Sequence, residues 1–103
     1  MENKTAKFGI GKYVIARTYS AGVFAGTLVA REGREAELAN ARRLWYWSGA
    51  ASLSELAMKG VKNPANCKFP AAVKQVLLTE VIEVIPAEPS AQKSIEEVTP
   101  WTA

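Results

Sequence analysis

Short stretches of apolar, β-branched and aromatic residues, separated by turn-forming residues, dominate the first part of the chain. Residues 13–19 and 23–30 have this character, and Ser-Ala-Gly at residues 20–22 separates them. The pattern predicts two antiparallel strands joined by a tight turn. After a second turn at residues 31–34, residues 35–38 are predicted to form a short strand with charged side chains on one face.

The most aromatic stretch, Ala41–Trp47, is predicted to form a fourth strand after a turn or cap at Asn40. Strand alternation would then direct the side chains of residues 43, 45 and 47 to one face and those of residues 42, 44 and 46 to the other. A small meander of these strands needs another element to cover its apolar face.

A helix is predicted directly after this stretch. Ser52 and Glu55 have the spacing of a capping box, in which the serine side chain accepts a hydrogen bond from the third helical amide. Apolar residues at 53, 56 and 57 form one stripe, and Gly60 is a natural stop. We therefore predict a helix over Leu53–Lys59.

The remaining chain contains a loop, an apolar run and a polar end. Residues 62–70 form a loop with two prolines, and residues 76–85 are apolar on both faces, which predicts one long, bent central strand. A short helix is predicted over residues 91–97. Trp101 is expected to dock on the core or on a neighbouring subunit, because burial of its ring removes a large apolar surface from water.

These elements predict an α+β fold, in which a small antiparallel sheet or meander carries one or two short helices. We expect a single domain over residues 1–103, a length that suits one hydrophobic core. Within it we expect a flexible leader at residues 1–10 and a sheet-and-helix core at residues 11–86. Residues 87–103 are expected to form a C-terminal helix and a tail that is available to a partner subunit.

Composition disfavours an enzyme. The chain contains no histidine and no aspartate, and its single cysteine is Cys67. Histidine-based catalytic triads, paired-cysteine redox chemistry and zinc sites built on several cysteines are therefore excluded. The sequence also lacks a phosphate-binding P-loop motif. We expect neither a cofactor nor a metal.

The N-terminal residues lack the apolar segment of a signal peptide, and the apolar runs are far shorter than a membrane span. A single thiol suits a reducing compartment. We therefore expect an intracellular, cytoplasmic protein that does not enter a membrane.

The net charge of +3 is unevenly distributed. Residues 1–75 hold 12 basic and 5 acidic side chains, a net +7, whereas residues 76–103 hold 1 basic and 5 acidic side chains, a net −4. Such a division indicates an anion-binding body with an acidic tail, charge complementarity between copies, or simply a solvated surface.

Three groups of residues are candidates for ligand binding. The first follows the first strand, where Arg17 stands beside the turn of Ser20 and Ala21. A guanidinium and several turn amides suit one phosphate group. The alternative is an ordinary hairpin turn with a surface arginine.

In the second group, Arg43, Trp45 and Trp47 would share one strand face, where a base can stack while its phosphate is paired. The alternative places both tryptophans in the core under the arginine stems. In the third group, Asn66 and Lys68 lie in a lysine- and asparagine-rich loop that either closes over a ligand or is simply solvated.

Four blocks of the sequence, at residues 16–28, 41–61, 67–69 and 79–86, resemble the first type of phage Thoeris anti-defence proteins, known as sponges, and their uncharacterised phage relatives. The resemblance implies a protein that sequesters cyclic ADP-ribose isomers, and in some members cyclic oligonucleotides, without cleaving them. It implies a pocket between two subunits and a homodimer or a trimer of dimers.

Within this resemblance, Arg17 and Ala21 would contact the phosphate and ribose. Phe24, Arg43, Trp45 and Trp47 extend the candidate site by stacking and charge pairing. The favoured function is therefore sequestration of a cyclic nucleotide-type messenger.

Two other functions stay open. The first is a phage protein that binds a host or phage protein through the exposed face of Trp45 and Trp47. The second is single-stranded nucleic-acid binding, which the acidic C-terminal segment disfavours and which would show a steep salt dependence.

Overall fold

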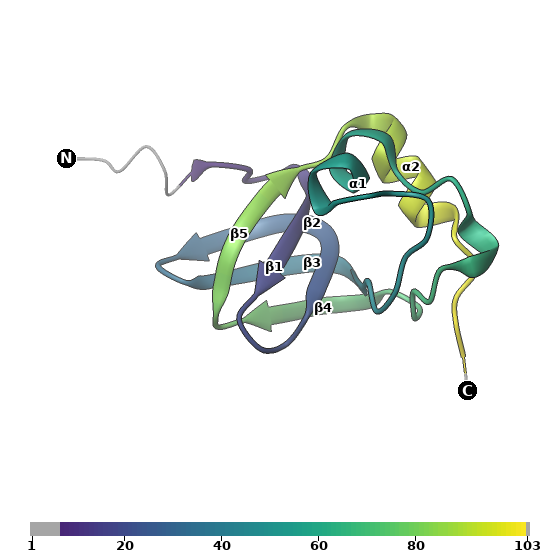
Figure 1. The fold of residues 1–103 in the computed structure, drawn as a ribbon. Coiled ribbons are helices and arrows are strands. Elements are labelled where there is room, and N and C mark those ends of the chain that lie inside the picture. The colour runs from purple at the N-terminus through teal and green to yellow at the C-terminus, as the bar shows by residue number, and fades with distance from the viewer. Residues whose placement is uncertain (1–6, 103) are drawn as a thin grey trace.

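A computed structural model describes residues 7–102 of the protein and has the α+β fold that the sequence predicts. Five strands and two α-helices follow one another along this part of the chain (Figure 1). Their order is β1 (Tyr13–Thr18), β2 (Val23–Glu32), β3 (Glu35–Arg43), α1 (Leu53–Lys59), β4 (Val73–Leu78), β5 (Val81–Pro86) and α2 (Pro89–Glu97).

The five strands form one antiparallel sheet in the order β4-β3-β2-β1-β5. Strands β4 and β5 are therefore at opposite edges, although only Thr79 and Glu80 separate them along the chain. So short a connection requires the sheet to curl until its two edges approach each other at this end (Figure 1). The amide of Val81 closes the gap further by donating to the carbonyl of Arg34 in the β2–β3 turn, at 2.9 Å.

The prediction of one central strand over residues 76–85 was therefore wrong. The second apolar face of the run is only partly covered, since Leu77 and Ile82 are 59% and 49% exposed. Val76, Val81 and Val84 pack inside the curl, whereas Ile85 packs against the cluster under the helices.

A β-bulge at Asn40 replaces the turn that was expected there. Asn40 has a φ of 50°, and the register between β2 and β3 passes from Ala25–Arg42 to Thr27–Ala39, with one extra residue in β3. The residues on either side of Asn40 thus form a single strand that ends at Arg43. The aromatic stretch beyond it is not a strand: the amide of Leu44 donates to the carbonyl of Val23 at 2.8 Å, and an isolated bridge joins Tyr46 to Lys68.

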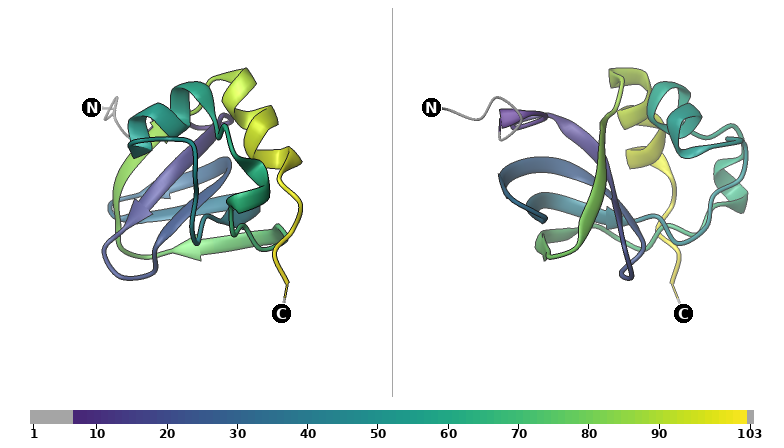
Figure 2. Two further views of the ribbon diagram at one scale, coloured as in Figure 1. Left: turned by 45° about the vertical axis from the view of Figure 1, so that its right-hand side comes forward. Right: turned by 60° about the vertical axis from the view of Figure 1, so that its left-hand side comes forward.

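Two hydrophobic clusters hold the layers together. One lies inside the curled sheet and includes Val14, Phe24 and Leu28. The other lies between the sheet and the helices and includes Ile15 of β1 and Ile95 of α2. Figure 2 shows both helices on the same side of the sheet. Each fully buried side chain of this size contributes about 1.5–3 kcal/mol to folding.

Local signals define α1 as predicted, over Leu53–Lys59. The Ser52 side chain accepts a hydrogen bond from the amide of Glu55, and Gly60 ends the helix with a φ of 74°. The Glu55 carboxylate accepts from the amide of Ala51, at 2.7 Å, and not from that of Ser52. The second helix begins at Pro89, earlier than predicted, because proline is well suited to the first helical position.

Part of the expected leader, residues 1–6, lies outside the described residues. Residues 7–10 form turns that continue into β1, and Gly9 is buried beside Leu28. The amide of Gly11 donates to the carbonyl of Leu28 at 2.8 Å. Gly9 therefore packs on the sheet, whereas Phe8 and Ile10 beside it are exposed. Among residues 7–102, no helix is long and apolar enough to cross a membrane.

We predict that Gly26→Ala lowers the free energy of unfolding by about 1–2 kcal/mol. A Cβ at Gly26 would lie 3.0 Å from both the Ala39 carbonyl oxygen and Ala41 Cα, which are backbone atoms of the bulge. Urea unfolding of the variant measures the loss. Asn40→Gly is the matched control, because glycine adopts the φ of 50° freely. A Gly26→Ala protein as stable as the wild type would contradict the prediction.

Candidate functional site

The turn between β1 and β2 is held in place from two sides. Within the turn, the amide and the hydroxyl of Thr18 donate to the carbonyl of Gly22, at 3.0 and 2.8 Å. Across to the β4–β5 turn, the amide of Tyr19 donates to the carbonyl of Glu80 at 2.9 Å. The Ser20–Gly22 turn therefore has a fixed place at one end of the curled sheet.

The bulge at Asn40 directs Arg43 towards this turn. One extra residue reverses the strand alternation, so Arg42 points under the helices and Arg43 points to the open end of the curl. There the Arg43 guanidinium lies over the ring of Phe24, 4.4 Å from its centre, and its Nη1 donates to the carbonyl of Ala21. Both contacts fix the orientation of an exposed cation.

A hollow of about 560 Å³ opens beside Arg43. It brings together five of the nine residues that the sequence proposes as ligand contacts, and its lining consists of Ser20, Ala21, Gly22, Val23, Arg43, Leu44, Trp45 and Trp47. We call it the Arg43 hollow. It offers a guanidinium, a turn of the backbone and two indole rings to one ligand.

The two tryptophans of the Arg43 hollow differ in burial. Trp45 is 64% exposed, whereas Trp47 is partly buried and packs against the cluster under the helices. Because the stretch is not a strand, they do not share a strand face as predicted. Trp45 therefore offers a free stacking surface, and Trp47 is partly a core residue.

Phe24 does not line the Arg43 hollow. Its ring is 4% exposed and belongs to the cluster inside the sheet. The expectation that it stacks on a ligand was wrong, because its position on β2 directs it inward. Its ring supports Arg43 instead.

Arg17 lies beside the Arg43 hollow and not in its lining. Its strand neighbour Val23 is in the lining, and its Nε donates to the carboxylate of Glu83 on β5 at 2.9 Å. Both side chains are about half exposed, so the pair contributes at most about 1 kcal/mol to stability. A ligand phosphate would have to compete with Glu83 for this guanidinium.

Two glutamates that the sequence analysis left without a role flank the candidate turn. Glu83 pairs with Arg17, and Glu80 accepts a hydrogen bond from the hydroxyl of Ser20 at 2.8 Å. The acidic excess of residues 76–103 was the available signal, but only the curl of the sheet reveals that it adjoins the turn. These carboxylates make the rim of the Arg43 hollow partly acidic.

Comparison with protein families matches residues 11–95 to a domain of unknown function, DUF6948. The chain belongs to the DUF6948 family. All nine candidate residues lie in the part of the chain that matches the DUF6948 domain, whereas Trp101 lies beyond it. A search of curated proteins finds no match to the chain.

Within the DUF6948 domain, Asn66 and Lys68 lie apart from the lining of the Arg43 hollow. Asn66 ends an exposed 3₁₀ turn at Pro64–Asn66. The Lys68 ammonium lies 5.9 Å from the ring centre of Tyr46 and 5.7 Å from that of Trp101. Asn66 and Lys68 are therefore not part of the Arg43 hollow. Trp101 is tied by its amide to the carbonyl of Phe69, at 2.9 Å, and its side chain remains 46% exposed.

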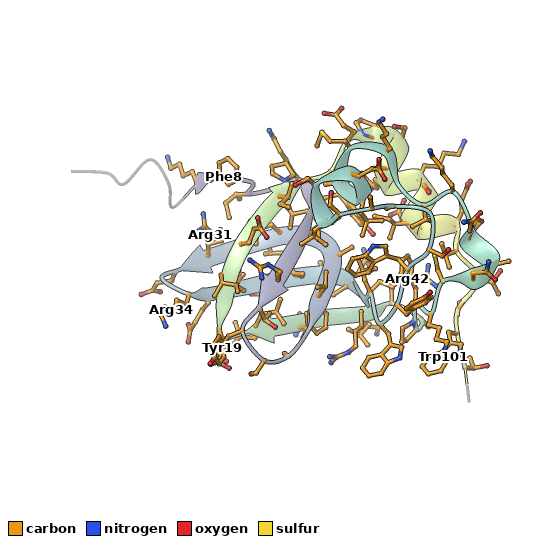
Figure 3. All side chains as sticks on the ribbon, viewed as in Figure 1. Phe8, Tyr19, Arg31, Arg34, Arg42 and Trp101 are labelled. Carbon is orange, nitrogen blue, oxygen red and sulfur yellow. The ribbon has the colours of Figure 1, made fainter. Side chains whose placement is uncertain are left out.

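Arg42 has a structural role in the DUF6948 domain that the sequence did not indicate. It is 5% exposed, and its guanidinium donates to the carbonyls of Phe69 and Pro70, both at 2.8 Å, and to that of Ile95 at 2.9 Å. Burial lowers the pKa of Arg42 from its usual range. Figure 3 shows Arg42 below α2, at the end of the molecule where Trp101 lies.

Alkaline pH is predicted to destabilise this DUF6948 domain through Tyr13. Burial, and next the negative charge of Glu96, raise the pKa of Tyr13 above its usual range. The unfolded chain therefore loses the phenol proton first, at a pKa of about 10, so stability falls as the pH rises above that value. The expected loss at pH 11 is about 1.4 kcal/mol.

Urea unfolding of the wild type and of Tyr13→Phe at pH 8 and pH 11 tests this prediction. Tyr13→Phe should remove the loss of stability at pH 11 that comes from this phenol. Tyr19→Phe, which changes an exposed phenol, should lose stability as the wild type does. An equal loss in the wild type and Tyr13→Phe would show that Tyr13 is not responsible.

Proposed function

We propose that this protein binds a small phosphorylated ligand of nucleotide type and holds it without converting it. The supporting observation is the Arg43 guanidinium, fixed by the Ala21 carbonyl and the Phe24 ring, beside the exposed indole of Trp45. An oriented guanidinium pairs with phosphate, and an exposed indole stacks on a base. The Arg43 hollow is large enough for such a ligand, since ligand pockets range from about 300 to 1,000 Å³.

The chemistry of the lining favours retention over turnover. Arginine does not release its proton near neutral pH, and the hydroxyl of Ser20 already donates to Glu80. The chain has no histidine, so the Arg43 hollow has no imidazole base, and the nearby carboxylates of Glu80 and Glu83 are engaged by Ser20 and Arg17. The acidic rim formed by Glu80 and Glu83 disfavours a long polyanion, so a small ligand fits better than a nucleic-acid strand.

In its finer form, the proposal is a cytoplasmic phage anti-defence protein that sequesters a cyclic ADP-ribose isomer or a cyclic oligonucleotide, as a homodimer or a trimer of dimers. This form rests on the resemblance of residues 16–28 and 41–61 to the sponge proteins. The position of Arg17 next to Val23 is compatible with it, because a ligand that displaces Glu83 would gain a second guanidinium.

A thermal-shift screen tests the proposal. The panel contains a cyclic ADP-ribose isomer, linear ADP-ribose, cyclic dinucleotides and inorganic phosphate as the control. A ligand at 100 times its dissociation constant should stabilise the fold by about 2.7 kcal/mol. Heating the complex should return the ligand intact by chromatography. No shift with any nucleotide, or the release of a cleaved product, would refute the proposal.

A second candidate is binding of another protein, because Trp45 and Tyr46 are 64% and 52% exposed side by side in the chain. Exposed aromatic side chains of this kind commonly act as anchors in protein interfaces. This function predicts no thermal shift with any nucleotide and the co-purification of one specific protein, which is lost in Trp45→Ala.

A further inference from the structure

Strand β4 forms an edge of the sheet with one unpaired side. It pairs with β3, and its backbone makes no other hydrogen bond to any residue in the range 7–102 (Figure 1). A row of unpaired amides and carbonyls is a template for another strand. The opposite edge, β5, is less accessible, because the amide of Val81 already donates to the carbonyl of Arg34 and Pro86 has no amide.

The side chains of β4 give this edge little protection. Val73 is 52% exposed and Leu77 is 59% exposed, and the exposed Gln75 lies midway between them. Proteins usually guard edge strands with charged residues, proline or β-bulges. Strand β4 has one charged residue, Lys74, no proline, and a constant register with β3. It therefore has the features of an edge that accepts another strand.

The order of these side chains makes β4 complementary to itself. In an antiparallel pair of two β4 strands centred on Gln75, Val73 of each copy lies opposite Leu77 of the other. The two Gln75 side chains then lie opposite each other and can exchange hydrogen bonds. A two-fold axis relates the copies, so one strand provides both halves of the interface. Each exposed apolar side chain of β4 thus gains an apolar neighbour.

The charges near β4 also favour an antiparallel pair. Lys74 stands near the start of β4, whereas Glu37 lies opposite Leu77 on β3, near the other end, and Glu35 precedes it. The antiparallel pair brings the basic end of each copy to the acidic end of the other, which is electrostatically complementary. Lys74 lies opposite the uncharged Val76 of the second copy, whereas a parallel pair in register would place two lysines side by side.

We infer that β4 is a docking surface for a second copy of this protein, through an antiparallel β4–β4 pair that continues the sheet from one copy into the other. No residue of β4 lines the Arg43 hollow, so the dimer forms with or without a ligand. The inference gives the homodimer of the finer proposal a definite interface but does not rest on nucleotide binding. A pair of six-residue strands is small for an interface, so we expect a weak dimer.

Sedimentation velocity of the full-length protein over a range of concentrations tests the inference. The protein is expected to pass from monomer to dimer as its concentration rises. Val73→Lys and Leu77→Lys should each weaken the dimer about tenfold or more, because each places a charge in an apolar cross-strand pair. Both side chains are exposed, so the fold should be retained. Val29→Lys is the matched control, because it changes a valine that is 45% exposed on the inner strand β2.

A disulfide at the two-fold axis tests the register of the pair. Residues directly opposite each other in an antiparallel pair have Cα atoms about 4.5–5.5 Å apart, a separation that a disulfide can span. Gln75→Cys should therefore cross-link two copies under mild oxidation. The wild type, in which Cys67 is buried, and Val29→Cys should not.

Three results would overturn the inference: a monomer at every concentration, a dimer that both lysine substitutions on β4 leave unchanged, or equal cross-linking of Gln75→Cys and Val29→Cys. A monomer that binds a nucleotide would leave the Arg43 hollow as the ligand site and β4 open to a strand of another protein. A dimer that binds no nucleotide would support the β4 interface and refute the proposed function.

Discussion

Replacing Arg42 by methionine is expected to lower the free energy of unfolding by about 3 kcal/mol or more. Methionine fills much of the same space but donates no hydrogen bonds. The carbonyls of Phe69, Pro70 and Ile95 would then lose their charged donor in a buried region. The carbonyls of Phe69 and Ile95 would keep only the amides of Trp101 and Val98 as donors. The loss of a donor to a buried carbonyl costs about 1–3 kcal/mol.

The position of Arg42 explains why one side chain has so large an effect. Its guanidinium connects β3 to the loop before β4 and to the C-terminal end of α2, where the helix dipole favours a positive charge. The prediction is that the loop and α2 lose their attachment together. Hydrogen exchange should therefore quicken in both segments when Arg42 is changed.

Urea unfolding at neutral pH measures the loss. Arg42→Lys is expected to recover only part of the stability, because one ammonium cannot reach all the carbonyls that the planar guanidinium reaches. The control is Arg43→Met, which removes the neighbouring but exposed arginine and should cost much less. Equal stabilities for the Arg42→Met and Arg43→Met variants would contradict the structural role of Arg42.

Replacing Arg43 by alanine is expected to weaken nucleotide binding about ten- to a hundredfold, the effect of one charge-assisted contact to phosphate. Arg43 is the one arginine in the lining of the Arg43 hollow, and its orientation is fixed before a ligand arrives. The Arg43 side chain therefore loses little conformational freedom when a ligand binds. Arg43→Lys should not restore the affinity, because lysine has neither the planar fork nor the stack on Phe24.

Isothermal titration calorimetry with the strongest nucleotide of the thermal-shift panel measures this change. Arg34→Ala is the matched control, since it removes the same charge from the exposed β2–β3 turn, and Arg34 does not line the Arg43 hollow. A similar loss in Arg34→Ala would indicate a general charge effect. If Arg43→Ala binds the nucleotide with unchanged affinity, the Arg43 hollow is not the binding site.

Local signals in the sequence were sufficient for several elements. The hairpin of β1 and β2 and the limits of α1 follow from residues that are close in the chain: the Ser-Ala-Gly turn, the Ser52 cap and the Gly60 stop. The sequence likewise identified five residues that share the Arg43 hollow, because turn residues and clustered tryptophans are recognisable by type. None of these predictions required knowledge of a distant contact.

The tertiary structure alone decided the features that depend on distant parts of the chain. The bulge at Asn40 lies opposite Gly26 in the pairing of β3 with β2, and it separates Arg42 from Arg43 into a core residue and a site residue. The curl of the sheet makes two edge strands from one apolar run and brings Glu80 and Glu83 to the β1–β2 turn. By itself, the sequence determined which residues are apolar, charged or turn-forming. Strand register and sheet curvature determined where they meet, because both arise from the packing of the whole chain and not from neighbouring residues.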